Sequence, residues 1–168
     1  MRAKHVMSSN EIIGDRFVVK LVSEQLDINE AIEWVSDCQC GAISLFIGKT
    51  RQTESDDRSG RHVQSLDYEA YEPMALKEMK LIVEQCVGQS DELVKCFVAH
   101  RLGRVCCGQT SIVIACSSAH RTEAHRLVLS LLNDIKAKVP IWKTINYSIN
   151  DSNDVKSEWS DKSEAFWL

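Results

Sequence analysis

Two lysines are the residues of this sequence best placed to do chemistry. Lys136 falls in the last turn of an expected helix, and Lys143 falls on the strand expected after the break at Pro140. Because the chain reverses near Pro140, the two ammonium groups can share one site. Strand alternation places Lys143 on an apolar face, where desolvating a charged amine is costly and favours its neutral form. The alternative is a lysine at a strand edge whose ammonium group extends into water.

Three further basic residues could bind an anion. His120 and Arg121 open the longest expected helix, and a helix N-terminus presents free backbone N–H groups and the positive end of the helix dipole. Arg51 leaves a strand into a polar loop and could add another contact. In the alternative interpretation, Ser117 or Ser118 only caps the helix and the basic side chains are solvated.

Length and composition exclude several classes of protein. The 168 residues are enough for one domain, and 44% hydrophobic with 26% charged residues is close to the globular average. No apolar stretch approaches the ~18 residues of a membrane-spanning helix. The net charge of −4 disfavours a general nucleic-acid binder. Between Lys95 and Lys143, however, eight basic residues oppose two acidic ones, which fits either a small anionic ligand or a solvated helix face.

The cysteines indicate a reduced, cytoplasmic protein. There are seven, an odd number, and none forms a Cys-x-x-Cys motif, which argues against a disulfide framework. The pairs Cys38-x-Cys40 and Cys106-Cys107 lack zinc-ligand spacing, so we expect no metal. The N-terminus lacks the apolar segment of a secretory signal. We therefore expect a cytosolic protein without a metal, a cofactor or a membrane contact.

The order of expected elements predicts a single α+β domain with a mixed or antiparallel sheet and three main helices. Strand patterns cover residues 17–22, 42–48, 63–71, 93–100, 110–116 and 141–149. Helical patterns begin at Asp27, run from Pro73 to Gly88, and form an apolar stripe from Ala124 to Ile135. We expect a flexible tail over residues 1–15, the folded domain over 16–150, a C-terminal tail over 151–168, and a mobile loop over 52–62.

Five short motifs resemble the catalytic (large) subunit of molybdopterin synthase. They are Gly41-Ala42 through Phe46-x-Gly48-Lys49-x-Arg51, Leu66-x-Tyr68-Glu69-x-Tyr71-x-x-Met74, His100-Arg101-Leu102-Gly103, Ser118-Ala119-His120-Arg121, and Pro140-Ile141-Trp142-Lys143. Each motif is short, but all five occur in order over about residues 40–145, at spacing similar to that of the family. The chain after Thr144 matches poorly. The resemblance implies the α/β hammerhead fold of that family.

The resemblance also implies a sulfurtransferase. Members of the family convert cyclic pyranopterin monophosphate into molybdopterin by installing two dithiolene sulfurs. The sulfur arrives as the C-terminal thiocarboxylate of a small ubiquitin-like subunit, whose Gly-Gly tail enters the large subunit. This chain ends in Phe-Trp-Leu and would therefore be the subunit that receives the tail. Its partners would be that carrier and a second copy of itself, in a heterotetramer, with no nucleic acid or membrane.

By position, the resemblance assigns Lys136 and Lys143 to the two active-site lysines of the family. It assigns substrate binding to Arg51, His120, Arg121 and, as an apolar contact, Phe46. A cyclic phosphate develops negative charge as it opens, and fixed cations can stabilise that charge. We hypothesise that Lys143 acts nearest the sulfur transfer and that Lys136 supports it.

Two alternatives and one departure from the family pattern stay open. The same basic residues could form a non-catalytic binding module for a ubiquitin-like tail or a phosphorylated ligand. A persulfide enzyme would instead need a reactive thiolate such as Cys116, although the resemblance gives the sulfur to the partner. Bacterial relatives place an arginine soon after a C-terminal tryptophan and contribute it across the dimer. Here Trp159 precedes Lys162, which lacks the guanidinium fork.

Overall fold

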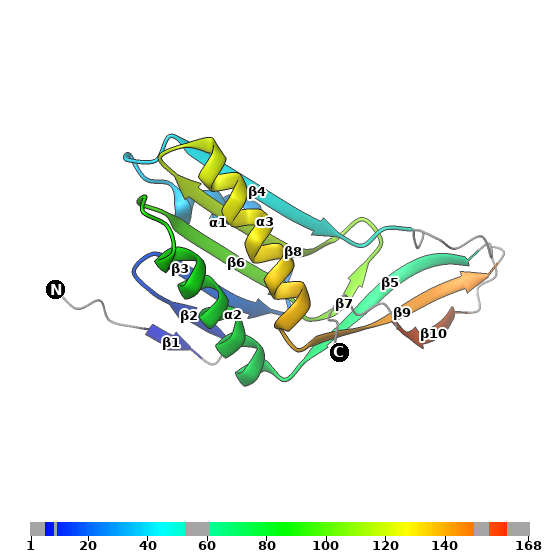
Figure 1. Cartoon of the computed structure of the whole chain (residues 1–168). Coiled ribbons are helices and arrows are strands. Elements are labelled where there is room, and N and C mark those ends of the chain that lie inside the picture. Colours follow the sequence, from blue (N-terminus) through cyan, green and yellow to red (C-terminus); the bar gives the residue numbers. More distant parts are fainter. Residues whose placement is uncertain (1–5, 9, 53–60, 150–154, 161–168) are drawn as a thin grey trace.

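Two β-sheets and three helices build the described part of the chain (Figure 1). The computed structural model describes residues 6–8, 10–52, 61–149 and 155–160. The larger sheet has the strand order β1 (Val6–Ser8), β2 (Glu11–Ile13), β3 (Phe17–Val22), β6 (Lys95–Arg101), β8 (Thr110–Ser118) and β4 (Ala42–Lys49). The smaller sheet has the order β10 (Val155–Trp159), β9 (Ile141–Ile149), β5 (Arg61–Ala70) and β7 (Gly103–Cys106). Only β3 and β6 pair in parallel among the described strands, which confirms the α+β prediction with one mixed and one antiparallel sheet.

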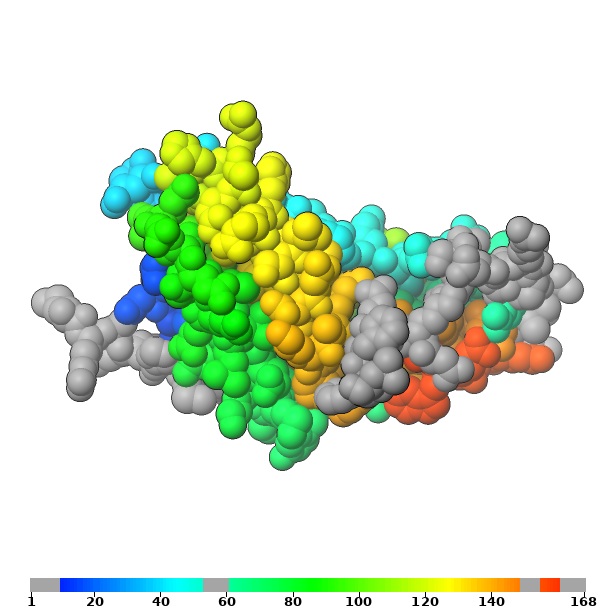
Figure 2. Space-filling view, viewed as in Figure 1, coloured from blue at the N-terminus to red at the C-terminus, as the bar shows by residue number. Residues whose placement is uncertain are grey.

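Helices cover both faces of the larger sheet. Figures 1 and 2 show α2 (Glu72–Gly88) and α3 (Arg121–Lys138) side by side on one face, and α1 (Ile28–Val35) packs on the other. Because β6 and β8 are buried on both faces, their sequences are nearly continuous apolar runs. The buried residues of α3 keep the three- and four-residue spacing expected from the sequence: Ala124, Leu127, Val128, Leu131 and Ile135. No helix in the described ranges is both long and apolar enough to cross a membrane.

The structure differs from the sequence prediction at the two ends of the chain. Within the tail expected over residues 1–15, β1 and β2 are strands, and Ile12 pairs with Val19 and is buried. Within the tail expected over residues 151–168, β10 pairs with β9. These strands have only three to five residues, and every side chain of β10 is exposed. Such short strands show too little apolar periodicity to be recognised in a sequence.

Between β6 and β7 the chain passes from the larger sheet to the smaller one. Gly103 has a φ of 74°, a left-handed conformation that favours glycine, and it begins β7. Leu102 is still tied to the larger sheet, because its N–H donates to the Val22 carbonyl at 2.7 Å. Gly103 then lies opposite Tyr68 in the smaller sheet. The glycine of the third motif therefore lets the chain pass from one sheet to the other.

The smaller sheet extends away from the C-terminal end of α3 (Figure 1). Strand β9 begins at Ile141, directly after Val139 and Pro140 end the helix. It lies between β5 and β10, and its register with β5 places Lys143 opposite Tyr68. Directly opposite residues in an antiparallel pair have Cβ atoms about 5 Å apart on the same face. The smaller sheet thus places Lys143 of the fifth motif next to Tyr68 of the second motif.

Candidate active site

A cavity of about 490 Å³ lies where the C-terminal end of α3 meets the two sheets. Residues from both sheets, from the last turn of α3 and from the segment after β4 contribute to its wall. Cavities of this volume are typical of small-molecule sites. This cavity is therefore large enough to hold a compact heterocyclic ligand.

The charged side chains in the described lining of this cavity are all cationic. Its described lining includes four cationic side chains, Lys49, Arg51, Lys136 and Lys143, and no aspartate or glutamate. Cations grouped in a cleft with low-dielectric walls attract and orient anions. Arginine also presents a planar fork of donors that matches phosphate oxygens. The arrangement is suited to a phosphorylated or carboxylated ligand.

Lys136 and Lys143 line the same cavity, as the chain reversal in the sequence predicts. The helix ends tightly, because the Val139 N–H donates to the Ile135 carbonyl at 3.0 Å and the Ile141 N–H donates to the Val139 carbonyl at 2.8 Å. Lys136 is exposed in the last turn of α3, where its positive charge interacts favourably with the negative end of the helix dipole. Lys143 is half-buried two residues before the buried Ile145.

Arg51 and Phe46 approach the cavity from β4 and the segment after it. The backbone on both sides of Arg51 is held in place. The Thr50 N–H donates to the Gln109 carbonyl at 3.0 Å, and the Gln52 carbonyl accepts from the Val63 N–H at 2.8 Å. Phe46 is half-buried and packs against the core beneath α2 and α3. The structure thus brings four of the six predicted site residues to one cavity.

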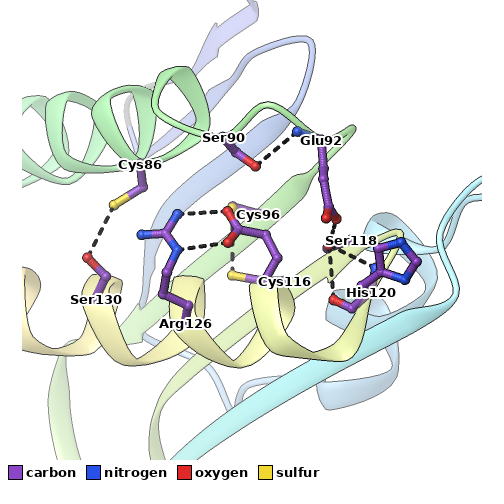
Figure 3. Close-up of polar contacts among 10 residues, drawn as sticks. Cys86, Ser90, Glu92, Cys96, Cys116, Ser118, His120, Arg126 and Ser130 are labelled. Atoms are coloured by element: carbon purple, nitrogen blue, oxygen red, sulfur yellow. Dashed lines mark hydrogen bonds and ion pairs between the residues drawn. The ribbon is translucent and has the colours of Figure 1, made fainter.

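His120 and Arg121 lie at the opposite end of α3 from this cavity. Both are exposed at the start of α3, whereas Lys136 lies in its last turn, about 22 Å away at 1.5 Å per residue. Neither lines the cavity. Ser118 does not cap the helix, since it is the last residue of β8. Its hydroxyl donates to Glu92 and accepts from the His120 N–H at 3.2 Å (Figure 3).

Sequence reasoning gave no role to His100 and Tyr68, which also line the cavity. Their rings meet edge to face with centroids 4.9 Å apart. Burial lowers the pKa of His100 to about 4 and raises the pKa of Tyr68, so both side chains are uncharged at neutral pH. Both residues occur in the family motifs, but only the pairing of distant strands shows that they face one ligand space.

The cysteines offer no reactive thiolate at this cavity. Cys116 is fully buried, with its Sγ 3.6 Å from the Sγ of Cys96 (Figure 3). The hydrogen bond to the Cys96 thiol, together with burial, raises the pKa of Cys116 well above that of a free thiol. None of the described cavity-lining residues is a cysteine. A persulfide at Cys116 is therefore disfavoured, because such chemistry needs an accessible thiolate. Lys162, the residue considered in place of the family arginine, lies outside the described residues.

Comparison with known proteins agrees with the motifs. The family model described as MoaE protein matches residues 21–138. A molybdopterin synthase catalytic subunit from Culex quinquefasciatus is 40% identical over 149 residues, which cover 89% of this chain and 90% of that protein. The same subunit from Drosophila grimshawi is also 40% identical, but the match covers 89% of this chain and only 39% of that longer protein.

Solved structures share the fold. The crystal structure of molybdopterin synthase from Staphylococcus aureus superposes with a TM-score of 0.72 and 27% identity, over 92% of this chain and 98% of that chain. A molybdopterin biosynthesis MoaE protein from Burkholderia ambifaria has a TM-score of 0.67 at 19% identity, over 84% of this chain and 86% of that chain, which is a likeness of fold. Family model, relatives and structure agree over most of the sequence. The chain belongs to the MoaE protein family, whose relatives described above are catalytic subunits of molybdopterin synthase.

Proposed function

We propose that the cavity at the end of α3 is where this catalytic subunit transfers sulfur from a small ubiquitin-like subunit to cyclic pyranopterin monophosphate, forming the dithiolene of molybdopterin. The observation that carries the proposal is the cluster of four cations without a carboxylate in the described lining. The substrate is a cyclic phosphate and the sulfur donor is a thiocarboxylate, so both reactants are anions. A cavity of this charge can hold the two anions close together.

The lysines have separate tasks in this proposal. Lys143, half-buried on the smaller sheet, lies nearest the sulfur transfer and stabilises the negative charge of the thiocarboxylate. Lys136 supports it from the last turn of α3. Arg51 binds the phosphate, and Phe46 contacts the apolar edge of the ring system. Preorganised donors of this kind typically contribute about 3 kcal/mol each to the stabilisation of a transition state.

The sulfur comes from the partner, so no cysteine of this chain takes part. The buried position of Cys116 agrees with that assignment. The partner is the small subunit with a thiocarboxylated Gly-Gly C-terminus, and the assembly is a heterotetramer around two copies of this chain. Neither a metal nor a cofactor is needed in this scheme. The cytosol is the compartment in which free thiols such as these stay reduced.

His120 and Arg121 act in this proposal from the second copy of the chain. Two observations support this. They lie too far from Lys136 to bind the same small ligand, and both are exposed at a helix start whose N-cap side chain makes no capping hydrogen bond. An exposed helix N-terminus with an arginine can bind an anionic group presented by a neighbouring molecule.

A mixed dimer tests this sharing. Arg121→Ala and Lys143→Ala are each expected to be strongly impaired alone. Co-expressed with different tags and purified as the mixed dimer, they leave one intact pocket of two, so about half of the wild-type activity should return. If Arg121 binds substrate within its own chain, both pockets are damaged and no activity returns. Full activity of Arg121→Ala alone would also contradict the proposal.

Product formation is the direct test of the proposed function. The purified chain is incubated with cyclic pyranopterin monophosphate and the thiocarboxylated small subunit, and molybdopterin is quantified as its fluorescent oxidised derivative. We expect product from the wild-type chain. Binding of the small subunit without any product would favour the non-catalytic binding module instead.

Two lysines in the same helical turn provide a matched comparison in this assay. Lys136 lines the cavity, whereas Lys138 does not line it and forms an ion pair with Asp134 at 2.6 Å. We expect Lys136→Ala to lower the rate of product formation by about 100-fold, because a fixed donor is lost. Lys138→Ala should stay close to wild type, since exposed i,i+4 ion pairs contribute little. Equal loss in both variants would mean that helix stability, not the cavity lysine, determines the rate.

A further inference from the structure

His100 is a buried histidine held in a single tautomer. Its Nδ1 lies 2.8 Å from the backbone carbonyl oxygen of Arg101. A carbonyl only accepts, so Nδ1 must carry the proton, and in the neutral ring Nε2 is then the bare, accepting nitrogen. The edge-to-face contact with Tyr68 fixes the plane of the ring. The protein thus presents one imidazole nitrogen in one defined direction.

The free nitrogen is accessible and belongs to a residue of the cavity wall. Nε2 makes no hydrogen bond within the described chain, and it is not one of the fully buried polar atoms without a partner, such as Thr50 Oγ1 or Ser117 Oγ. It therefore keeps some accessible surface although the residue is only 7% exposed, and His100 is part of the cavity wall. A buried polar atom without a protein partner is usually satisfied by water or by a ligand.

Its neighbours keep this nitrogen an acceptor. Burial places the pKa of His100 at about 4, so the ring stays neutral at physiological pH. Tyr68, whose pKa is raised, supplies no negative charge that would stabilise a protonated ring. The described lining residues include no aspartate or glutamate that would stabilise a protonated ring.

The other side chains around the ligand space are mainly donors. The lysines and Arg51 donate only, and the Ser111 hydroxyl donates to the Gly48 carbonyl at 3.3 Å. A phosphate needs such donors, but the N–H and O–H groups of a heterocycle need an acceptor. We propose that His100 Nε2 accepts a hydrogen bond from an N–H or O–H group of the pyranopterin ring and so determines which ring systems the cavity binds. This inference rests on the proposed function and assigns it a substrate-recognition residue.

Two variants separate recognition from structure. His100→Gln can place an amide oxygen near the position of Nε2 but loses the bond to the Arg101 carbonyl. His100→Asn can keep that bond through its amide N–H but has no acceptor that reaches the cavity. Affinity for cyclic pyranopterin monophosphate is measured by calorimetry without the small subunit, so that no turnover occurs, and inorganic phosphate serves as a ligand without a ring.

We expect His100→Asn to weaken pyranopterin binding by about tenfold or more, because a substrate donor is left unpaired. His100→Gln should stay within about threefold of wild type. Phosphate affinity should be unchanged in both. The reverse order, with Asn near wild type and Gln impaired, would show that His100 is only structural and would overturn the inference.

Failure of this inference can be distinguished from failure of the proposed function. A wild-type chain that does not bind the pyranopterin contradicts the proposed function, whereas equal binding by wild type and His100→Asn contradicts only the role of His100. If both variants unfold, the wild-type chain labelled with ¹⁵N-histidine still gives an answer. The Nε2 resonance of His100 should shift when pyranopterin, but not phosphate, is added. An unchanged resonance at saturation would overturn the inference.

Discussion

Replacing Lys143 with alanine is expected to lower molybdopterin formation by about 100-fold or more, with little change in stability. The β5–β9 register places Lys143 in the wall of the cavity, whose described lining includes three other cationic side chains and no aspartate or glutamate. Loss of the Lys143 ammonium group removes a preorganised positive charge from the step in which two anions react. The measurement is the initial rate of product formation with saturating thiocarboxylated small subunit.

A lysine elsewhere on the smaller sheet serves as the control for this prediction. Lys156 of β10 is exposed, lies opposite Tyr147 and does not line the cavity. Lys156→Ala should retain at least about half of the wild-type rate, since surface substitutions away from the site change little. Thermal unfolding of both variants shows whether the fold is kept. Near-normal turnover by Lys143→Ala would remove Lys143 from the reaction.

Replacing Phe97 with alanine is expected to destabilise the chain by about 4 kcal/mol. Phe97 lies on β6 and is 1% exposed. It packs under α1, with its ring centroid 6.4 Å from that of Trp34, and the ammonium group of Lys20 lies 5.1 Å from the ring centroid. Truncation leaves a cavity between α1 and the larger sheet, and neither element can fill it without shifting its backbone. The measurement is urea unfolding followed by tryptophan fluorescence.

The control for Phe97→Ala is another large apolar residue that contributes nothing to the core. Leu129 is 59% exposed on α3, and Leu129→Ala should change the free energy of unfolding by less than about 0.5 kcal/mol. A loss of less than about 1 kcal/mol for Phe97→Ala would show that the core beneath α1 adapts to the missing ring, contrary to its tight packing.

Much of the fold follows from local patterns. Helices α2 and α3 are long, strongly periodic and bounded by Pro73 and Pro140, so the sequence predicts them well. Strands β6 and β8 are continuous apolar runs, and β4 and β9 are also found close to their expected bounds. The short strands β1, β2 and β10 escape prediction, because their existence depends on a partner strand rather than on their own composition.

The candidate site likewise contains residues that local sequence predicts and residues that it does not. Lys136 and Lys143 are seven positions apart around Pro140, so a local reversal is enough to predict that they share a site. The sequence also allows the distance between Lys136 and the pair His120 and Arg121 to be predicted. The three residues belong to one expected helix, whose length follows from its number of residues. The resemblance of the motifs predicts that these two residues belong to the site, and in our proposal the second copy of the chain contributes them.

The sequence by itself determined the family, the α+β class, the principal helices and strands, and the pair of lysines, because each of these depends on residue types at short separations. Only the tertiary structure decided that Tyr68 and His100 join them. Tyr68 lies opposite Lys143 through the β5–β9 register, and His100 reaches the same cavity from a strand of the other sheet. Such pairings depend on burying one core across segments far apart in the chain, and no short-range pattern encodes which segments will meet.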